Sequence, residues 1–299
     1  MSAESYALVF VAPRDNKPAY REALMLLGRV ALARRLPPPA VLSGWESAEW
    51  IYPDVDGELR QEAAAAVAEL PVDWALVAVD GRRKKLLVAD MDSTIIDVEC
   101  LDELADFAGI KPEIAAITER AMKGELAFEP ALKQRVEKLK GLPVELLERT
   151  YEERVRLSPG AATLARTMAA HGARCVLVSG GFDFFTSRVA QAAGFHANRA
   201  NVLVDDGKAL TGEVMAPILG RRAKCETLHS EASALAISPD AAAAIGDGAN
   251  DLDMIKAAGL GIAYRAKPIV AAQAHARIEH TTLETALFFQ GYRRGEFAP

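Results

Sequence analysis

The sequence predicts an α/β protein whose core is a doubly wound, Rossmann-like parallel sheet. The main observation is a series of short apolar runs that alternate with helical periodicity after residue 85, as βαβ units require. The run Lys85–Ala89 is apolar beyond its first residue, which is typical of a strand covered on both faces in a parallel sheet. A helix-rich block follows that strand, and a mixed strand and helix pattern precedes it. We therefore expect a helical cap insertion and a small N-terminal α+β domain.

Residues 1–81 are predicted to form that N-terminal domain. The β-rich run Tyr6–Ala12 ends at Pro13, and a second extended stretch follows the proline-rich break after residue 36. Two segments carry helical patterns, Lys17–Leu32 and Leu59–Leu70, and Trp74–Val79 is a further predicted strand. The order resembles the βαββαβ pattern of regulatory ACT-type domains. A structural or dimerising role and an amino-acid-sensing role are both left open.

Residues 82–299 are predicted to form the second domain, after a charged linker at residues 81–85. The cap is expected at about residues 98–158, where helical segments are broken by glycine and proline. Further strands and helices then alternate, with strands predicted at Arg174–Val178, Ala241–Ile245 and Leu260–Tyr264. An Asp-Gly turn within Asn201–Thr211 predicts a β-hairpin.

Composition excludes several function classes. A net charge of -6 and a pI near 5.5 provide no basic surface for nucleic acid. The three cysteines (Cys100, Cys175 and Cys225) have no metal-ligand spacing and indicate a reducing compartment. No apolar run reaches transmembrane length, and the first residues lack the basic segment of a signal peptide. We expect a cytoplasmic protein that does not bind membranes.

Three polar clusters each follow a predicted strand at its carboxyl end. They are Asp90 with Asp92, Ser179–Gly181, and Gly246–Asp251. One such cluster alone could equally be a helix cap or a solvated loop. In open α/β sheets, however, ligands bind outside the carboxyl ends of the strands. The three clusters are therefore expected to meet in one crevice.

These residues resemble the four motifs of the haloacid-dehalogenase-type phosphohydrolases, in order, from about Lys85 to Gln290. The motifs are Asp90-Met-Asp92-Ser-Thr94, Ser179, Lys224 and Gly246-Asp247-Gly-Ala-Asn250-Asp251. Within that superfamily, Glu99, Phe128, Arg135 and the run GDGANDLDM are similar to the phosphoserine phosphatases. The resemblance implies hydrolysis of O-phospho-L-serine to L-serine and phosphate, the last step of serine biosynthesis.

The resemblance also implies how the reaction proceeds. Asp90 would attack phosphorus and form an aspartyl-phosphate, and Asp92 would act as the general acid and base. The cofactor would be Mg²⁺, a hard cation that prefers oxygen ligands, held by Asp90, the Asp92 backbone carbonyl and Asp247. Its charge would also relieve the repulsion between the two neighbouring carboxylates.

The remaining motif residues would hold the phosphoryl group. The Ser179 hydroxyl and the Gly180 amide would donate hydrogen bonds to its oxygens, supported by a following helix N-terminus. Lys224 would supply a positive charge. Asn250 would orient the phosphate, and Asp251 would orient Lys224 or a metal-bound water.

Substrate choice is expected to come from the cap. The family match implies that Glu99 binds the substrate ammonium group and that Arg135 binds the carboxylate by a bidentate pair. Met122 and Phe128 are candidates for apolar walls, although packing inside the cap would explain them as well. The five histidines fall outside the strand-end clusters and are interpreted as structural or surface residues.

Two alternatives are left open. The first is a phosphatase or phosphotransferase of the same superfamily that acts on another small phosphorylated metabolite, such as phosphohomoserine or phosphothreonine. The second is an amino-acid-sensing regulatory protein with an inactive core, against which the intact set of Asp90, Asp92, Lys224 and Asp247 argues. A homodimer is possible on either view.

Overall fold

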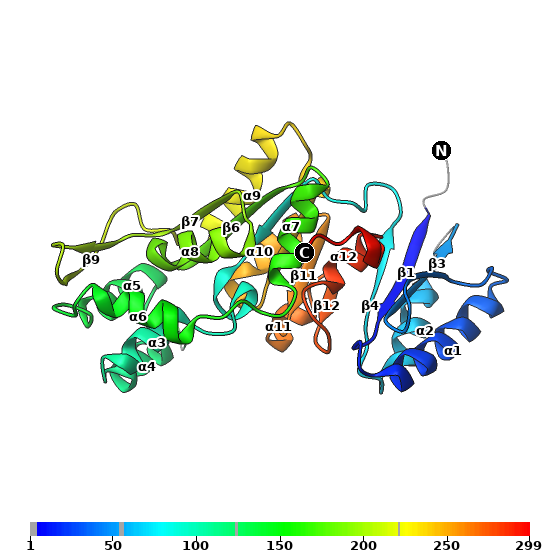
Figure 1. The fold of residues 1–299 in the computed structure, drawn as a ribbon, viewed down its shortest axis with the longest axis horizontal. Coiled ribbons are helices and arrows are strands. Elements are labelled where there is room, and N and C mark those ends of the chain that lie inside the picture. Colours follow the sequence, from blue (N-terminus) through cyan, green and yellow to red (C-terminus); the bar gives the residue numbers. More distant parts are fainter. Residues whose placement is uncertain (1–4, 54–56, 123–124, 221) are drawn as a thin grey trace.

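The computed structural model describes residues 5–53, 57–122, 125–220 and 222–299. The elements form three groups along the long axis of the molecule (Figure 1). An N-terminal α+β unit lies at one end, the helices α3–α6 lie at the other end, and a parallel sheet with its own helices lies between them. The predicted α/β fold class is confirmed.

The N-terminal unit has the predicted βαββαβ order. Its elements are β1 (Tyr6–Val11), α1 (Lys17–Ala33), β2 (Ala40–Ser43), β3 (Ser47–Tyr52), α2 (Gly57–Val67) and β4 (Asp73–Ala78). The strands pair antiparallel in the order β2-β3-β1-β4. Alternate residues of β1 bury Leu8 and Phe10 in a cluster with α1 and α2, while Ala7 and Val9 join the core cluster of the rest of the chain.

The central sheet is parallel throughout and has the order β12-β11-β10-β5-β6-β7. Its strands are β5 (Leu86–Ala89), β6 (Arg174–Phe182), β7 (Ala197–Asn201), β10 (Ala242–Gly246), β11 (Leu260–Tyr264) and β12 (Ala276–Ile278). In chain order, β6 and β7 are added to one side of β5, and β10, β11 and β12 are added to its other side. A switch of this kind opens a crevice between β5 and β10 at their carboxyl ends.

Helices cover both faces of this sheet, which explains why its inner strands are apolar throughout. The helices are α7 (Ala161–Ala170), α8 (Asp183–Ala193), α9 (Ala223–Ala234), α10 (Leu252–Ala257), α11 (Pro268–Ala271) and α12 (Thr285–Phe289). Leu87 and Leu177 pack in the cluster that contains α7, α8 and α12. Their neighbours Leu86 and Val178 pack against α9 and α10 on the opposite face.

The predicted cap consists of four helices, α3 (Cys100–Phe107), α4 (Lys111–Met122), α5 (Phe128–Glu137) and α6 (Glu145–Arg154). The predicted hairpin is formed by β8 (Leu203–Asp205) and β9 (Leu210–Val214), and it extends the cap (Figure 1). Leu210 exchanges backbone hydrogen bonds with the segment at Gly141 and Leu142, at 2.8 and 2.9 Å. The hairpin thus belongs structurally to the cap although it follows β7 in sequence.

Three details differ from the sequence-based expectation. Strands β7 and β12 were not predicted, and β6 continues to Phe182 instead of ending at Val178. Both missed strands are sheet edges that pair on one side only. The β7 sequence Ala-Asn-Arg-Ala-Asn therefore lacks the apolar pattern of a covered strand. Because β6 is longer, Ser179 and Gly180 lie within a strand, and α8 begins only at Asp183.

Buried charged residues join the N-terminal unit to the central sheet. The Asp73 carboxylate accepts hydrogen bonds from the backbone N–H groups of Glu279 and Thr281, at 2.8 and 2.9 Å. Arg82 forms an ion pair with Glu49 at 2.7 Å. The two parts are therefore docked by specific contacts, and the division of the chain into domains at residues 81 and 82 stays a prediction.

Across the described residues, no helix is long and apolar enough to cross a lipid bilayer.

Candidate active site

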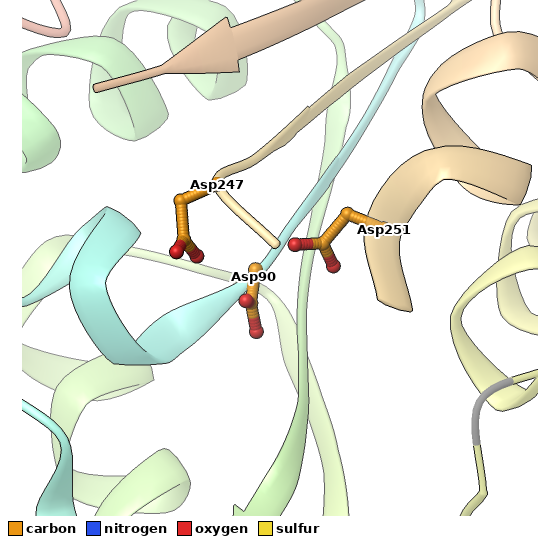
Figure 2. Close-up of side chains that lie close together, drawn as sticks. All are labelled: Asp90, Asp247 and Asp251. Atoms are coloured by element: carbon orange, nitrogen blue, oxygen red, sulfur yellow. The ribbon is translucent and has the colours of Figure 1, made fainter. Parts of the chain in front are cut away.

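Three aspartates converge at the crevice between β5 and β10. Asp90 follows β5, Asp247 follows the neighbouring strand β10, and Asp251 lies in the turn that leads into α10. Their side chains lie close together (Figure 2), with one carboxylate oxygen from each lying within 4.8 Å of the others. A Cβ at Gly246 would overlap the Asp251 carboxyl, so this approach requires glycine at the strand end.

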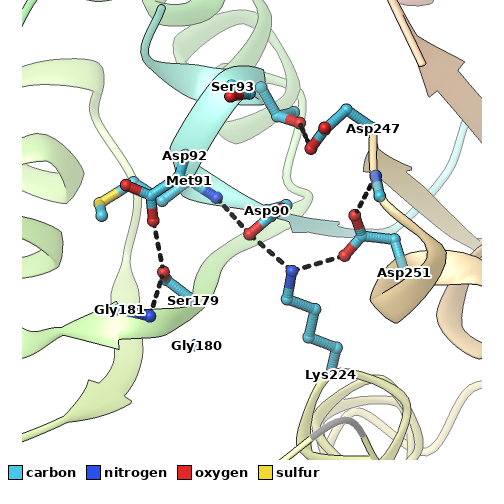
Figure 3. Close-up of polar contacts among 12 residues, drawn as sticks. Asp90, Met91, Asp92, Ser93, Ser179, Gly180, Gly181, Lys224, Asp247 and Asp251 are labelled. Carbon is cyan, nitrogen blue, oxygen red and sulfur yellow. Dashed lines mark hydrogen bonds and ion pairs between the residues drawn. The ribbon is translucent and has the colours of Figure 1, made fainter. Parts of the chain in front are cut away.

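Lys224 inserts into this group from α9 (Figure 3). Its ammonium lies 2.7 Å from the Asp90 carboxylate and 2.5 Å from that of Asp251. The residue is only 4% exposed. A buried ammonium is stable here because two carboxylates accept its hydrogen bonds. The other Asp251 oxygen accepts the N–H of Gly248 at 2.9 Å, which fixes its orientation.

The cluster carries more negative charge than one lysine balances. Burial, followed by the charge of Asp251, raises the pKa of Asp90 well above its usual range, although Lys224 opposes the change. Burial and Asp251 also raise the pKa of Asp247. Burial alone would lower the pKa of Lys224, but Asp90 and Asp251 outweigh it and leave this pKa raised. Several oxygen donors with excess negative charge fit a hard divalent cation.

Asp92 is held apart from this cluster, on the opposite side of Asp90. Its carboxylate accepts a hydrogen bond from the Ser179 hydroxyl at 2.8 Å (Figure 3) and one from the Cys100 N–H at 2.9 Å. The Ser179 hydroxyl in turn accepts the Gly181 N–H at 2.8 Å. Asp90 and Asp92 thus face the same cavity with different partners, so they can perform different tasks.

Glu99 stands at the mouth of the cavity, as the residue before α3. The Ser93 hydroxyl donates a hydrogen bond to its carboxylate at 2.6 Å. Although the residue is exposed overall, partial burial of its carboxyl and the nearby charge of Asp92 raise the pKa of Glu99 to about 7. Arg135 reaches the same cavity from α5, and burial lowers its pKa while Asp102 and Glu99 oppose this shift.

Core and cap together enclose a cavity of about 360 Å³. Every predicted site residue except Asp251 lines this cavity. Asp251 lies behind the lining and forms an ion pair with Lys224, which does line it. Phe128 forms part of the wall and lies against Gly180, where a Cβ would be in van der Waals contact with the ring at 3.4 Å. The side chain of Met122 lies outside the described residues. Among the described lining residues there is no histidine, in line with the prediction.

Some residues of the site were given no role by the sequence reasoning. Ser93 binds Glu99, and the Thr94 hydroxyl donates to Asp247 at 3.3 Å. Asn201 donates to the Gly180 carbonyl at 2.9 Å and accepts the N–H of Leu219. Ser93 and Thr94 stand inside the first motif, so their position was a usable signal. Asn201 gave no signal, because its role depends on β7.

The strand-end aspartates, the buried lysine and the helical cap define the class of the protein. The family model of the haloacid dehalogenase-like hydrolases matches residues 87–256, more than half of the chain. The fold and the site thus define a hydrolase of this class.

Comparison with individual relatives identifies the family within this class. A phosphoserine phosphatase of Polaromonas sp. is 45% identical over 208 residues, which cover 68% of this chain and 88% of that protein. Phosphoserine phosphatase SerB2 of Mycobacterium tuberculosis is 39% identical over 85% of this chain, which spans 63% of that longer protein. The crystal structure of a probable phosphoserine phosphatase from Vibrio cholerae matches with a TM-score of 0.76 and 32% identity, covering 96% of this chain and 86% of that one. The chain belongs to the phosphoserine phosphatase family.

Proposed function

We propose that this protein hydrolyses O-phospho-L-serine to L-serine and inorganic phosphate, with Asp90 as the nucleophile. One observation carries the proposal. The cavity is lined from the core by an acidic cluster with a buried lysine and from the cap by the oppositely charged pair Glu99 and Arg135. Such an arrangement is complementary to a substrate that has a phosphate at one end and an ammonium and a carboxylate at the other.

The metal is proposed to be Mg²⁺, held by the side chains of Asp90 and Asp247 and by the backbone carbonyl of Asp92. The supporting observations are the close approach of the carboxylates and the raised pKa values of Asp90 and Asp247. When bound, the ion supplies positive charge that offsets the repulsion between Asp90 and the phosphate dianion.

In the first half of the reaction, an Asp90 carboxylate oxygen attacks phosphorus and the bond from phosphorus to the serine oxygen breaks. Asp92 gives its proton to that leaving oxygen. Its contacts with Ser179 and Cys100 hold the carboxyl at the required side of Asp90. The phosphoryl oxygens are bound by Lys224, Ser179, the Gly180 amide and Asn250. To donate to a phosphoryl oxygen, the Ser179 hydroxyl must give up its hydrogen bond to Asp92.

In the second half, water attacks the phosphorus of the aspartyl-phosphate. Asp92 is now ionised and accepts a proton from that water, so each half of the reaction leaves it in the state that the next half needs. The bond between phosphorus and the Asp90 oxygen breaks, which releases phosphate and restores the carboxylate.

Substrate choice is assigned to the cap side of the cavity. Glu99 would bind the ammonium group of phosphoserine and Arg135 its carboxylate. Phe128 would exclude water from the reacting end, since its ring already lies against Gly180.

Serine biosynthesis is the proposed pathway and the cytoplasm the proposed location. A homodimer through the N-terminal unit is also proposed, because Met25, Leu32 and Val41 expose apolar surface there.

The test is a phosphate-release assay on phosphoserine, phosphothreonine, phosphohomoserine and sugar phosphates, with and without Mg²⁺. We expect turnover of phosphoserine in preference to the others, and none after chelation. Asp90→Asn should abolish turnover with an unchanged circular dichroism spectrum, while Asp15→Asn, on the surface of the N-terminal unit, should leave it unchanged. Near-normal turnover by Asp90→Asn would refute the assignment of the nucleophile, and preference for another substrate would refute the function.

A further inference from the structure

Lys267 is a basic residue of the cavity wall that has no role in the reaction described above. It lies between β11 and α11, and its φ and ψ of -59° and 146° are those that a residue before proline prefers. Its backbone N–H donates to the carbonyl of Asp247 at 3.2 Å, and its own carbonyl accepts the N–H of Ala271 at 3.0 Å. The backbone thus ties this position to the Asp247 loop whatever side chain it carries.

The charge of Lys267 is uncommitted, unlike that of Lys224, which is bound by two carboxylates. Arg135, the third basic residue of the lining, also forms no ion pair among the described residues, but it lies on the cap and is already assigned to the substrate carboxylate. In the part of the chain that the structure describes, no carboxylate lies within ion-pair distance of the Lys267 ammonium, and the residue is exposed. It is close enough to Asp247 to oppose the rise in the pKa of that carboxyl.

An uncommitted cation matters here because the cavity is acidic. Five of its lining side chains are carboxylic acids, against three cations: Asp90, Asp92, Glu99, Asp102 and Asp247 against Arg135, Lys224 and Lys267. A phosphate dianion that approaches such a cavity meets this excess of carboxylic acids before it reaches the deeply buried Lys224 and the proposed Mg²⁺. An exposed cation in the cavity wall lowers this repulsion and raises the local concentration of the anion.

We propose that Lys267 is a positioning residue that draws the phosphate group of the substrate into the cavity and holds it before Asp90 attacks. The inference rests on the proposed phosphatase function and extends it to substrate capture. Since the contact exists before the chemical step, its loss should reduce kcat/KM through KM and leave kcat nearly unchanged.

The test compares Lys267→Ala with Lys256→Ala, which removes the same charge from an exposed site on α10 outside the cavity lining. At low ionic strength we expect Lys267→Ala to lower kcat/KM for phosphoserine by about tenfold and to change kcat by less than about twofold. At about 0.5 M KCl, where the Debye length is about 4 Å, the difference from the unmodified protein should largely disappear. Lys267→Arg should restore most of the loss at low salt, and Lys256→Ala should behave like the unmodified protein.

A second measurement separates this inference from the proposed function. Calorimetric binding of inorganic phosphate to the Mg²⁺-loaded protein should weaken in Lys267→Ala and stay unchanged in Lys256→Ala, whichever phosphate ester is the substrate. The inference is overturned if both variants lose the same amount, if the loss in Lys267→Ala is independent of salt, or if kcat falls while KM does not.

Discussion

Glu99 leads to a prediction about the pH dependence of substrate recognition. Partial burial and the charge of Asp92 raise the pKa of its carboxyl to about 7, from an ordinary value of 4.5. Only the ionised form attracts the ammonium group of phosphoserine. With a pKa of about 7, roughly 90% of Glu99 is ionised at about pH 8 and roughly 10% at about pH 6. The contribution of this contact to kcat/KM should therefore fall by about tenfold over that range.

The assay measures kcat/KM for O-phospho-L-serine and for L-3-phosphoglycerate, which carries a hydroxyl in place of the ammonium group. Titration of the phosphate and of the aspartates proposed as catalytic affects both substrates alike, so the ratio of the two values isolates Glu99. We expect the ratio to fall below about pH 7 in the unmodified protein. In Glu99→Gln it should be low and independent of pH, because the amide carries no charge. A ratio that stays constant with pH in the unmodified protein would refute the reasoning.

Three further predictions concern Arg135, Asp73 and Ser93. Arg135→Ala should lower kcat/KM for phosphoserine by about 30- to 100-fold, the value of a charged hydrogen-bonded pair, with little loss on phenyl phosphate. The control is Lys133→Ala, which removes an exposed charge from the same helix. Equal losses on both substrates would argue against a contact between Arg135 and the substrate carboxylate. Asp73→Ala should lower the free energy of unfolding by about 2–4 kcal/mol, because it leaves the backbone N–H groups at residues 279–281 unpaired; an unchanged thermal midpoint would contradict this. Ser93→Ala removes the hydrogen bond that favours the ionised form of Glu99. The pH at which the ratio of the two kcat/KM values changes should therefore rise by about one unit. An unchanged midpoint would show that this hydrogen bond does not affect the pKa of Glu99.

The inner strands of the sheet could be predicted because their sequence reflects their surroundings. Strands β5, β6, β10 and β11 are covered on both faces, and helix packing on each side requires apolar residues at successive positions. Edge strands do not need a continuous apolar sequence, which is why β7 and β12 were not predicted. The docking of the hairpin onto the cap depends on the contact between Leu210 and Leu142, residues far apart in the chain. Local pattern contains no information about such a pairing.

Within the site, the sequence indicated the residue types better than their orientations. An extended chain would place Asp90 and Asp92 on the same face, and both do line one cavity. Their carboxylates nevertheless have different partners, because the chain turns sharply after Asp92. Ser93 has a φ of 56°, in the left-handed region that few non-glycine residues adopt. This turn directs the Ser93 hydroxyl to Glu99, and no spacing rule would have predicted it.

The sharing of Lys224 between Asp90 and Asp251 has a consequence for the proposed reaction. When the Asp90 carboxylate becomes an acyl phosphate, it loses its charge and with it most of its attraction for the ammonium. A lysine held by Asp90 alone would then lose its carboxylate partner. Asp251 is fully buried and fixed by the Gly248 N–H, so its contact with Lys224, at 2.5 Å in this structure, does not depend on the charge of Asp90. The ammonium therefore stays beside the new phosphoryl oxygens, where its charge can stabilise the attack of water.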